Sequence, residues 1–471
     1  MGSESNFNTL ADFRSQRDLS APACKRLDLL FDENTFMELG VFAGSKDRAS
    51  GVVTGYGYVE GNLVYAYAQD ITADGGAVGA VHAAKIKKVY EMAAKTGAPV
   101  VGIFDSNGAR MDEGHDAMAG YGDLLACANH VSGVVPQIAL VLGTCAGAAA
   151  MIAASADIVI AAEKAEFFLT APFITQAKGE KVEGAGSAKN AALSGAVQIL
   201  EADEEKAIER AHQLIAMLPA NNLSPVPINE FAASETIPVP GMKAADLIAS
   251  IADAGSVVAL QPDFGKAAVT AFAAIGGSTA GVVATEGGRL DADTCAKIAR
   301  FVRTCDAFNL PVVTLVDTEG FVESSAAELA GSVRDAAKLA HAYAEATCPK
   351  ISIVTGQAYG PAYIVLAGKN ANADVTVAWE QAVISPLAPV TAVEVLWRER
   401  MVGTQDVAAT REALVTEYKQ TLASPFAAAG GGYVDTIILP EETRGTIISL
   451  LEALEGKRVS KMPKKHGNMP F

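Results

Sequence analysis

Two turns rich in small residues have the pattern of a site that works through backbone N–H groups. Each follows an apolar run and precedes a helical pattern: they are Cys145-Ala146-Gly147-Ala148 and Tyr359-Gly360-Pro361-Ala362. A strand that ends in such a turn and enters a helix presents N–H groups without partners, all aimed in one direction. Two donors about 3 Å from a developing oxyanion stabilise an enolate, each by roughly 3–4 kcal/mol. Small residues at one turn can also serve only close helix–strand packing, whereas two equivalent turns favour an oxyanion site.

Side chains give little support for any other catalytic chemistry. The six histidines and six cysteines form no HExxH, CxxC or Cys/His signature, so we predict no metal site. The sequence also lacks the glycine-rich phosphate loops of dinucleotide-binding and nucleoside triphosphate-binding proteins. The chain is therefore either not an enzyme or an enzyme whose catalysis rests on backbone groups.

The same order of elements leads to both turns. Two β-rich stretches come first, and a long helical pattern follows, over residues 78–95 in one half and 292–308 in the other. A short strand then ends in IFDSNGAR or LVDTEGF, and a second strand ends in GTCAGAA or GQAYGPA. Strands that alternate with helices in this way predict an α/β fold with largely parallel strand pairing.

The two halves are similar in sequence as well as in pattern. Asp105 and Asp317 are 212 positions apart, and Gly147 and Gly360 are 213 apart. Four segments match in the same order at a nearly constant offset, which indicates a duplicated domain. We predict an N-terminal domain over residues 1–218 and a C-terminal domain over residues 242–471. The segment 219–241 between them contains five prolines and has no helical period, so we predict a linker there.

The composition indicates which binding partners and which cellular location are expected. With 37 basic and 54 acidic residues the formal charge is −17, which disfavours binding to nucleic acid and to anionic membranes. The apolar run 138–154 is interrupted by Gly and Thr, so a strand, a turn and a helix explain it better than a membrane span. Unpaired cysteines, together with an N-terminus (residues 1–18) that has no apolar signal core, indicate a cytoplasmic protein.

Several segments resemble one protein family along nearly the whole chain. In the first half they include KRLDLLFDENTFMELG, DSNGARMDEGHDAMAGYGDLL and SGVVPQIALVLGTCAGAAAM. In the second half they include AKLAHAYAEATCPKISIVTGQAYGPAYIV and the terminal KKHGNMPF. The chain is similar to the carboxyltransferase (β) subunits of biotin-dependent acyl-CoA carboxylases, a family typified by the propionyl-CoA carboxylase β chain and the methylmalonyl-CoA decarboxylase α chain. The resemblance implies an α/β fold of two tandem crotonase-like domains, internally duplicated.

The resemblance also implies a reaction and its partners. In this family a carboxyl group moves between carboxybiotin, attached to a separate carrier protein, and the α-carbon of a short acyl-CoA such as acetyl-, propionyl- or methylmalonyl-CoA. The implied partners are the biotin carboxyl carrier protein and either biotin carboxylase or membrane decarboxylase subunits. Family members join the N-terminal half of one subunit to the C-terminal half of another. A homo-oligomer is therefore implied, commonly a hexamer.

Matching the family's motifs assigns roles to particular residues. The catalytic set contains the enolate turn and the turn that stabilises the ureido oxygen of biotin: Gly147 and Ala148, then Gly360, Pro361 and Ala362. The binding set contains residues on the CoA side and on the biotin side: Gly108, Ala109 and Arg110, then Tyr359 and Ile364. For the CoA phosphates we favour Arg110, which lies beside the expected pocket, over the other local cations: Lys25, Arg26, Lys85, Lys87 and Lys88.

Some positions depart from the family's pattern. Pro361 occupies a position that is usually Gly, and proline has no N–H to donate. Either Gly360 and Ala362 donate together, or one biotin-side donor is lost. We expect the first, because proline is well tolerated in a first helical turn. Ile364 lies where propionyl-CoA enzymes have Asp, at a position associated with acyl-chain choice, and Asn107 replaces a Gly two residues before Ala109.

Three alternatives remain open at this point. The chain could be the α subunit of a sodium-pumping acyl-CoA decarboxylase, which runs the same transfer in the decarboxylating direction. It could be a crotonase-type hydratase or isomerase, for which a Glu or Asp base should lie near the enolate. It could also be a non-catalytic assembly subunit, a reading motivated by Pro361 and Asn107.

Overall fold

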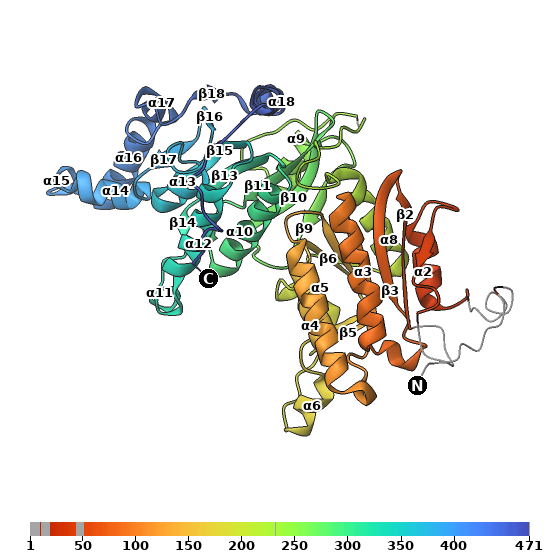
Figure 1. The fold of residues 1–471 in the computed structure, drawn as a ribbon. Coiled ribbons are helices and arrows are strands. Elements are labelled where there is room, and N and C mark those ends of the chain that lie inside the picture. Colours follow the sequence, from red (N-terminus) through yellow and green to blue (C-terminus); the bar gives the residue numbers. More distant parts are fainter. Residues whose placement is uncertain (1–9, 11–18, 44–50, 231, 471) are drawn as a thin grey trace. The chain divides into compact units, whose positions relative to one another are not determined.

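The computed structural model describes residues 10, 19–43, 51–230 and 232–470. These residues form two compact units, Met1–Pro227 and Ile228–Phe471, each built around an eight-stranded sheet (Figure 1). The division falls at Pro227, inside the proline-rich segment 219–241. The N-terminal residues 1–18, which contain no apolar signal core, lie outside the described residues except for Leu10.

The sheet of unit 1 is antiparallel at one edge and parallel over the rest. In sheet order its strands are β1 (Met37–Leu39), β2 (Val52–Val59), β3 (Asn62–Gln69), β4 (Val100–Ser106), β5 (Gln137–Ala146), β6 (Ile158–Ala162) and β8 (Ile199–Glu201). Strand β7 (Glu166–Phe168) pairs with the end of β5. The central strands β4 to β6 are almost entirely buried and apolar, because helices cover both faces of a parallel sheet.

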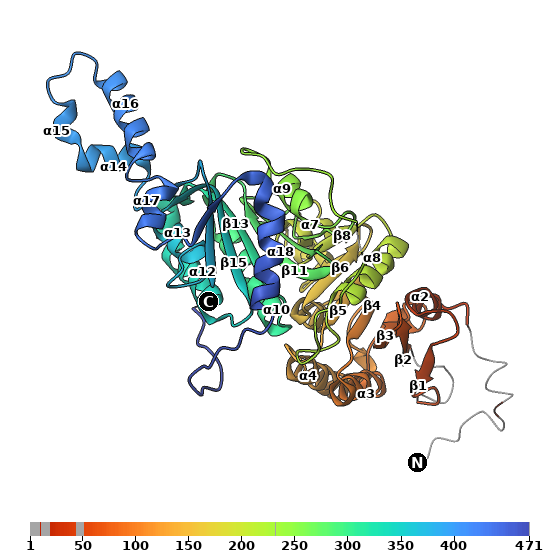
Figure 2. The same ribbon diagram turned by 90° about the horizontal axis from the view of Figure 1, so that it is seen from above.

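Helices of unit 1 lie on both faces of this sheet (Figures 1 and 2). On one face α2 (Pro22–Leu30) packs on α8 (Glu204–Met217), and on the other α3 (Ala80–Thr96) packs on α4 (His115–His130). The remaining helices are α5 (Ala148–Ser155), α6 (Pro172–Ala177) and α7 (Ala188–Leu193), with 3₁₀ turns at Asp74–Gly76 and Met111–Glu113. Helix α5 starts directly after β5, which places its N-terminus at the carboxyl end of the parallel strands.

Unit 2 repeats this sheet. In order its strands are β9 (Val258–Leu260), β10 (Ala268–Ile275), β11 (Ser278–Thr285), β13 (Val312–Thr318), β15 (Lys350–Tyr359), β16 (Val375–Trp379) and β18 (Thr436–Ile438). Strand β17 (Val383–Ser385) pairs with the end of β15, and β12 (Arg289–Leu290) pairs with β14 (Gly320–Phe321). The order β10-β11-β13-β15-β16-β18 matches β2-β3-β4-β5-β6-β8 strand for strand, which confirms the predicted duplicated α/β fold.

The helices of unit 2 follow the same plan with an added arm. They are α9 (Ala244–Ile251), α10 (Ala292–Ala307), α11 (Ser325–Ala330), α12 (Ser332–Glu345), α13 (Gly360–Leu366), α17 (Pro425–Gly430) and α18 (Thr443–Leu454), with a 3₁₀ turn at Pro440–Glu442. The arm consists of α14 (Pro389–Leu396), α15 (Arg398–Met401) and α16 (Val407–Gln420), and it extends away from the sheet of unit 2 (Figure 2). A small core of its own, centred on Val393 and Tyr418, holds the arm together. Among the described residues, no helix combines the length and apolarity needed to cross a membrane.

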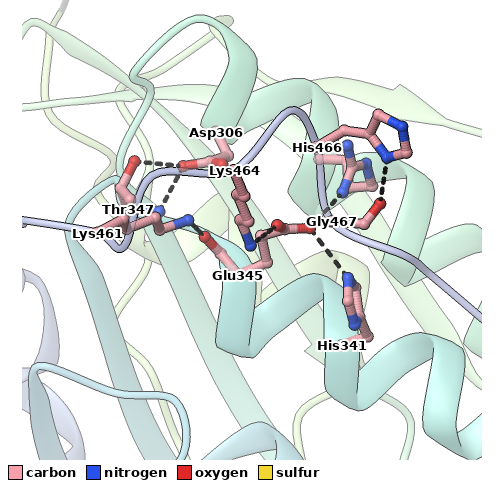
Figure 3. Close-up of polar contacts among 9 residues, drawn as sticks. Asp306, His341, Glu345, Thr347, Lys461, Lys464, His466 and Gly467 are labelled. Carbon is pink, nitrogen blue, oxygen red and sulfur yellow. Dashed lines mark hydrogen bonds and ion pairs between the residues drawn. The ribbon is translucent and has the colours of Figure 1, made fainter.

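After α18 the C-terminal tail returns across unit 2 and is held by ion pairs (Figure 3). Glu345, in the last turn of α12, accepts from Lys464 Nζ at 2.5 Å, His341 Nε2 at 2.9 Å and Arg303 Nη1 at 3.1 Å. Lys461 also donates to the Glu345 carbonyl oxygen. The hydrogen bond from Lys464, followed by those from His341 and Arg303, lowers the pKa of Glu345 to about 2. The tail is therefore attached mainly through charges, at Glu345 and, directly after α18, through Lys457, which pairs with Asp374 at 2.7 Å.

Candidate active site

Unit 1 contains a cavity of about 870 Å³ at the carboxyl end of its parallel strands. Two short segments border it: the turn after β4, with Asn107, Gly108 and Ala109, and the turn after β5, with Ala146, Gly147 and Ala148. Apolar side chains from α4, α5, α6 and the segment before α6 form most of the remaining wall: Met118, Leu125, Met151, Ile152, Phe168, Leu169, Phe173 and Ile174. The cavity lining contains no charged side chain among the described residues. A cavity of this size and polarity can hold a small acyl group and exclude water from it.

The turn after β5 brings an N–H group to the cavity, but it belongs to Ala148. Gly147 has φ +60° and ψ −123°, a conformation that glycine adopts at little cost. Its own N–H donates to the Phe168 carbonyl oxygen at 2.9 Å, in the ladder between β5 and β7. Helix α5 begins at Ala148, so the N–H groups of its first turn have no acceptor within the helix. Gly147 therefore shapes the turn, and Ala148 is the residue whose N–H is available.

The turn after β4 supplies a second N–H group. Val78 pairs with Ala109 in an isolated parallel bridge, in which Val78 N donates to Gly108 O at 2.9 Å and Arg110 N donates to Val78 O at 3.0 Å. Backbone groups of successive extended residues point in opposite directions. The N–H of Ala109 therefore points away from Val78, and no acceptor in the described part of the chain takes it. Ala109 and Ala148 both line the cavity, so two unused donors border the same space.

Burial keeps the groups beneath this cavity neutral. Cys145 is fully buried, and burial raises the pKa of its thiol far above the ordinary value. Burial also raises the pKa of Tyr121, whose ring lines the cavity and whose hydroxyl oxygen has no partner in hydrogen-bonding geometry. Neither group can act as a base near neutral pH. The described lining therefore offers hydrogen-bond donors, together with the positive end of α5, and no ionised base.

The cations considered for CoA phosphates are mostly engaged within the protein. Arg110 does not line the cavity; it pairs with Asp74, lies 3.6 Å from Asp112 and 3.9 Å from Glu113. Arg26 is buried between Asp105 and Glu204, at 2.7 Å from each. Lys85 is buried and donates to the Val52 carbonyl oxygen. Lys87 is exposed but pairs with Asp123 at 3.0 Å. The buried positions of Arg26 and Lys85 exclude them as ligands for a phosphate in solution.

The equivalent turn of unit 2 also has a glycine with positive φ, but a proline follows it. Gly360 has φ +51°, close to the +60° of Gly147, and starts helix α13. Pro361 stands at the position of Ala148 and has no N–H, whereas Ala362 follows it and is fully buried. Tyr359 is buried, and its hydroxyl donates to the Gln357 side chain. Ile364 is 54% exposed on the same helix. The residues predicted for the biotin side thus lie together at one helix start.

Unit 2 has a much smaller cavity of about 200 Å³ beside the turn after β13, lined from β12, α10, α11 and α12. Its lining includes Phe321, the counterpart of Ala109, together with the carboxylates of Asp291 and Asp335. Burial raises the pKa of Cys295, which also lines this cavity, to about 12, so this thiol is not a nucleophile. No group of three or more metal-ligating side chains comes together within the described ranges of the chain. Residues 359–362 at the start of α13 are not part of the lining of this cavity.

Some residues that shape the site were missed by reasoning from motifs. Asp105 and Ser106 end β4, and Asp317 and Thr318 end β13; their side chains bind the backbone of the neighbouring turns. The signal was present in the repeated sequence Asp-Ser-Asn-Gly and Asp-Thr-Glu-Gly. Tyr121 was also missed, because nothing in a helical pattern distinguishes a tyrosine that lines a cavity from one in the core.

Comparisons with known proteins all match this chain to carboxyl transferases. A family model described as carboxyl transferase domain matches residues 20–469. The chain is 39% identical over 482 residues to the methylmalonyl-CoA decarboxylase subunit alpha of Propionigenium modestum, with 95% of this chain and 93% of that protein covered. It is 39% identical over 492 residues to the propionyl-CoA carboxylase beta chain of Saccharopolyspora erythraea, with 95% and 90% covered.

A solved structure is similar over both units. The transcarboxylase 12S crystal structure, described as a hexamer assembly with methylmalonyl-coenzyme A and methylmalonic acid bound, has a TM-score of 0.88 and 35% sequence identity. The alignment covers 95% of this chain and 92% of that chain. The similarity therefore includes both turns and the strands that lead to them.

Proposed function

The chain belongs to the carboxyl transferase family, and we propose that its two tandem crotonase-like units divide the family's reaction between them. The protein is a biotin-dependent carboxyltransferase that moves a carboxyl group between carboxybiotin and the α-carbon of an acyl-CoA. We assign the acyl-CoA to the N-terminal domain, residues 1–218, and biotin to the C-terminal domain, residues 242–471, with residues 219–241 as the linker. The observation that carries this assignment is the apolar cavity of unit 1, bordered by the unused N–H groups of Ala109 and Ala148.

On the acyl-CoA side the backbone stabilises charge on the thioester. When the α-carbon loses a proton or a carboxyl group, negative charge moves onto the thioester oxygen. The N–H groups of Ala109 and Ala148, with the positive end of α5, are placed to bind that oxygen. The apolar walls exclude water, which strengthens these interactions and protects the enolate from protonation by solvent. Gly147 contributes by holding the turn in its left-handed conformation.

On the biotin side the residues fit a neutral urea. A ureido oxygen needs hydrogen-bond donors and no cation, and the start of α13 offers N–H groups without a lysine or arginine in the turn. Gly360 and Ala362 are the residues that we assign to this oxygen, with Tyr359 buried beneath them. Biotin, when bound, supplies the N1 atom that carries the carboxyl group. Pro361 then fixes the direction of the helix start rather than donating.

The names of similar proteins support our proposal for the substrate class and the partners, and they include both directions of transfer. Relatives at 39% identity are named both for a decarboxylase and for a carboxylase, so the same site is used in either direction. We propose a short acyl-CoA of the acetyl-, propionyl- or methylmalonyl-CoA class, and a biotin carboxyl carrier protein as the source of carboxybiotin. The other partners are biotin carboxylase or membrane decarboxylase subunits. The six unpaired cysteines fit a cytoplasmic location, and the hexamer assembly of the 12S relative makes a homo-oligomer our choice for this chain.

The two remaining alternatives have less support. A hydratase or isomerase needs a carboxylate base in the cavity, and the lining of the unit 1 cavity contains no Asp or Glu among the described residues. A non-catalytic subunit would have no need for a large apolar cavity beside two unpaired donors.

A direct assay tests the proposed reaction. Purified protein is incubated with malonyl-, methylmalonyl- or glutaconyl-CoA and free biotin, and the loss of the carboxyl group is followed with and without biotin. We expect biotin-dependent decarboxylation of at least one of the three. Hydration of crotonoyl-CoA is measured in parallel. Hydration without any biotin-dependent reaction would replace this proposal with the hydratase reading.

A complementation experiment tests the shared site between subunits. Gly147→Val disables the enolate turn and Gly360→Val disables the biotin turn, so each variant alone should be inactive. If one subunit contributes unit 1 and another contributes unit 2, mixed oligomers contain intact sites, and random pairing restores about a quarter of the wild-type activity. Subunit exchange is verified with differently tagged copies. Exchange without any return of activity would place both turns of one site in the same chain.

A further inference from the structure

The last two residues of β4 bind the two segments that bear the donors in unit 1. Asp105 Oδ1 accepts from the Thr144 N–H at 3.2 Å, and Thr144 lies in β5, four residues before Ala148. Ser106 Oγ accepts from the Gly108 N–H at 3.1 Å, and Gly108 directly precedes Ala109. Asp105 and Ser106 are 5% and 0% exposed. Two neighbouring side chains thus connect the strand end to both donor segments.

The ladder between β4 and β5 is interrupted at this point. Phe104 pairs with Val141 and Ser106 pairs with Cys145, so three residues of β5 lie opposite Asp105 alone. The Asp105 side chain fills this bulge: a Cβ added at Gly143 would lie 2.0 Å from Asp105 Oδ1. Side-chain hydrogen bonds therefore replace ladder hydrogen bonds where the backbone must separate to form the site. The glycine at position 143 is required because the carboxylate occupies the space of its side chain.

Unit 2 contains the same arrangement. Asp317 Oδ1 accepts from Gln357 N at 2.8 Å, and Thr318 Oγ1 accepts from Gly320 N at 3.2 Å. The ladder between β13 and β15 shifts between Val316 and Thr318, and a Cβ at Gly356 would lie 2.3 Å from Asp317 Cγ.

The glycine turns that follow the hydroxyls are also alike in the two units. Gly108 and Gly320 have φ +116° and +112°. The spacing, the bulge and the left-handed glycine are therefore all reproduced, although the two units differ at most other positions of these turns.

We propose that Asp105-Ser106 and Asp317-Thr318 are positioning residues, which set the separation of the two turns that follow the central strands of each unit; in unit 1 these turns carry the N–H groups of Ala109 and Ala148. The aspartate fixes the strand that leads to the helix start, and the hydroxyl fixes the turn that carries the other N–H. Two hydrogen bonds on adjacent residues leave little freedom for one donor segment to move relative to the other. This inference rests on the proposed function, because it assumes that Ala109 and Ala148 act on one oxygen.

The hydroxyl gives the cleanest test, since Ser106→Ala removes its contacts to the Gly108 N–H at 3.1 Å and to the Gly108 carbonyl oxygen at 3.4 Å and changes no charge. Errors of about 1 Å in catalytic geometry cost up to about a hundredfold in rate, so we expect Ser106→Ala to lower the transfer rate at saturating acyl-CoA by about tenfold to a hundredfold. Ser106→Thr should stay within about threefold of wild type, because unit 2 uses threonine at this place and keeps the hydroxyl. Ser250→Ala is the matched control: Ser250 is also buried and bonded to backbone, at Leu247 O, but lies in α9.

A binding measurement separates a positioning role from a general loss of stability. The two probes are S-ethyl-CoA, a thioether without the oxygen, and a CoA analogue that ends in a carboxylate in place of the thioester, which imitates the enolate. Wild-type protein should bind the carboxylate analogue at least about tenfold more tightly than the thioether. Ser106→Ala should lose most of this preference while its affinity for the thioether stays within about twofold, and Ser250→Ala should keep the preference.

The outcomes distinguish the inference from the function on which it rests. A preference that survives in Ser106→Ala, or a rate loss that Ser250→Ala shares in proportion to its thermal stability, overturns the positioning role alone. Wild-type protein without any preference for the carboxylate analogue has no enolate site in unit 1, and the proposed function and this inference then both fail.

Discussion

The two units keep one scaffold and differ where chemistry takes place. Both have a left-handed glycine at the end of the second central strand, with φ +60° at Gly147 and +51° at Gly360. The next residue is Ala148 in unit 1 and Pro361 in unit 2, so one turn has an N–H where the other has none. The two units thus share the positive-φ glycine and differ in whether the residue after it has an N–H.

The cavities and the charges behind them differ in the same way. Unit 1 has about 870 Å³ of largely apolar space, and unit 2 has about 200 Å³ with two carboxylates in its lining. Asp105 is paired with Arg26 at 2.7 Å, whereas its counterpart Asp317 has no cation partner among the described residues. A large apolar cavity suits an acyl chain, and this contrast is why we assign the acyl-CoA to unit 1. The two units thus share the order of their strands and differ in the lining and the charges beside it, which is the contrast on which our assignment of two ligands rests.

The largest expected effect comes from giving unit 1 the turn of unit 2. Ala148→Pro converts Gly-Ala-Ala into the Gly-Pro-Ala of unit 2 and removes the N–H that we assign to the enolate. Loss of one oxyanion donor should lower turnover by roughly a hundredfold to a thousandfold. Ala148 is the first residue of α5, a position where proline is well tolerated because its missing N–H has no acceptor within the helix. Turnover is measured with the acyl-CoA that the decarboxylation assay identifies.

A matched variant controls for the effect of proline at a helix start. Val407 is the first residue of α16, in the arm of unit 2, and is 46% exposed. Val407→Pro should leave turnover unchanged. Normal turnover in a folded Ala148→Pro protein would remove Ala148 from the site and leave the first turn of α5 as a packing feature.

Replacing Asp105, which is paired with Arg26, should affect the stability of the protein differently from replacing Asp317, which has no cation partner among the described residues. Asp105→Asn leaves Arg26 with Glu204 alone, and weakening a buried pair in this way should cost about 2–3 kcal/mol of unfolding free energy at pH 7. Asp317→Asn keeps the acceptor for Gln357 N and removes a carboxylate whose pKa is raised by burial, with a smaller contribution from Glu319. Unfolding in urea at several pH values measures both effects.

The stability change caused by Asp317→Asn depends on pH. Because the folded protein holds a proton on Asp317 more tightly than the unfolded chain does, the ionised carboxylate lowers stability above its folded pKa. Asp317→Asn should therefore be as stable as wild type or more stable at pH 7. The difference should shrink as the pH falls through the raised pKa and vanish below the ordinary value of 3.8. Equal destabilisation by both substitutions at pH 7 would contradict the contrast between the units.

The segments that follow the last helix of each unit should respond differently to acid. In unit 1, Asn221 binds the Gly97 carbonyl oxygen through its amide at 2.8 Å, without charge. In unit 2, Glu345 binds the tail through Lys464, and its pKa of about 2 lies below the ordinary 4.5. This contribution to stability is complete above pH 4.5 and is lost as the pH falls toward 2.

Limited proteolysis measures this difference. Below pH 4 the tail around Lys461 and Lys464 should become cleavable by an acid-active protease before residues 219–223 do. Lys464→Ala should make the tail cleavable at neutral pH, and Lys465→Ala, which alters an exposed neighbour without a contact to Glu345, should not. Cleavage of both segments at the same pH would show that the charges at Glu345 do not hold the tail.

The sequence was sufficient for the fold because the fold rests on repeated patterns. Matches at offsets of 212 to 217, such as Asp105 with Asp317, predicted two similar domains, and the sheet order confirms them. The donors could not be predicted as well. Gly147 was expected to donate, but β7 pairs with the end of β5 and its Phe168 takes that N–H. A short strand that returns to an earlier one leaves no mark in the local sequence.

The contacts of the positively charged side chains near the site could not be predicted from the sequence. Arg110 follows the glycine turn, as the motif requires, yet three carboxylates from two nearby 3₁₀ turns surround its guanidinium. Lys85 looked like its neighbours in the helix but is buried beneath β2, as its counterpart Lys297 is beneath the start of β10. Whether a cation meets a ligand or a carbonyl oxygen depends on tertiary contacts, which the periodicity of one helix does not contain.

The smallest effect is expected from giving unit 2 the turn of unit 1. Pro361→Ala restores an N–H at the position of Ala148 and relaxes the fixed φ of the helix start. If Gly360 and Ala362 already bind the ureido oxygen, an added donor between them is redundant, and the transfer rate should change by less than about tenfold. The rate is measured at saturating acyl-CoA with varied free biotin, so that a change in biotin affinity is separated from a change in turnover. Pro361→Ser adds an N–H as well and serves as a second variant.

A gain of about a hundredfold in both variants would mean that the native turn lacks a donor it could use, because one oxyanion donor has an effect of that size. The two units would then differ in catalytic capacity as well as in ligand, and unit 2 would be specialised for an acceptor other than biotin.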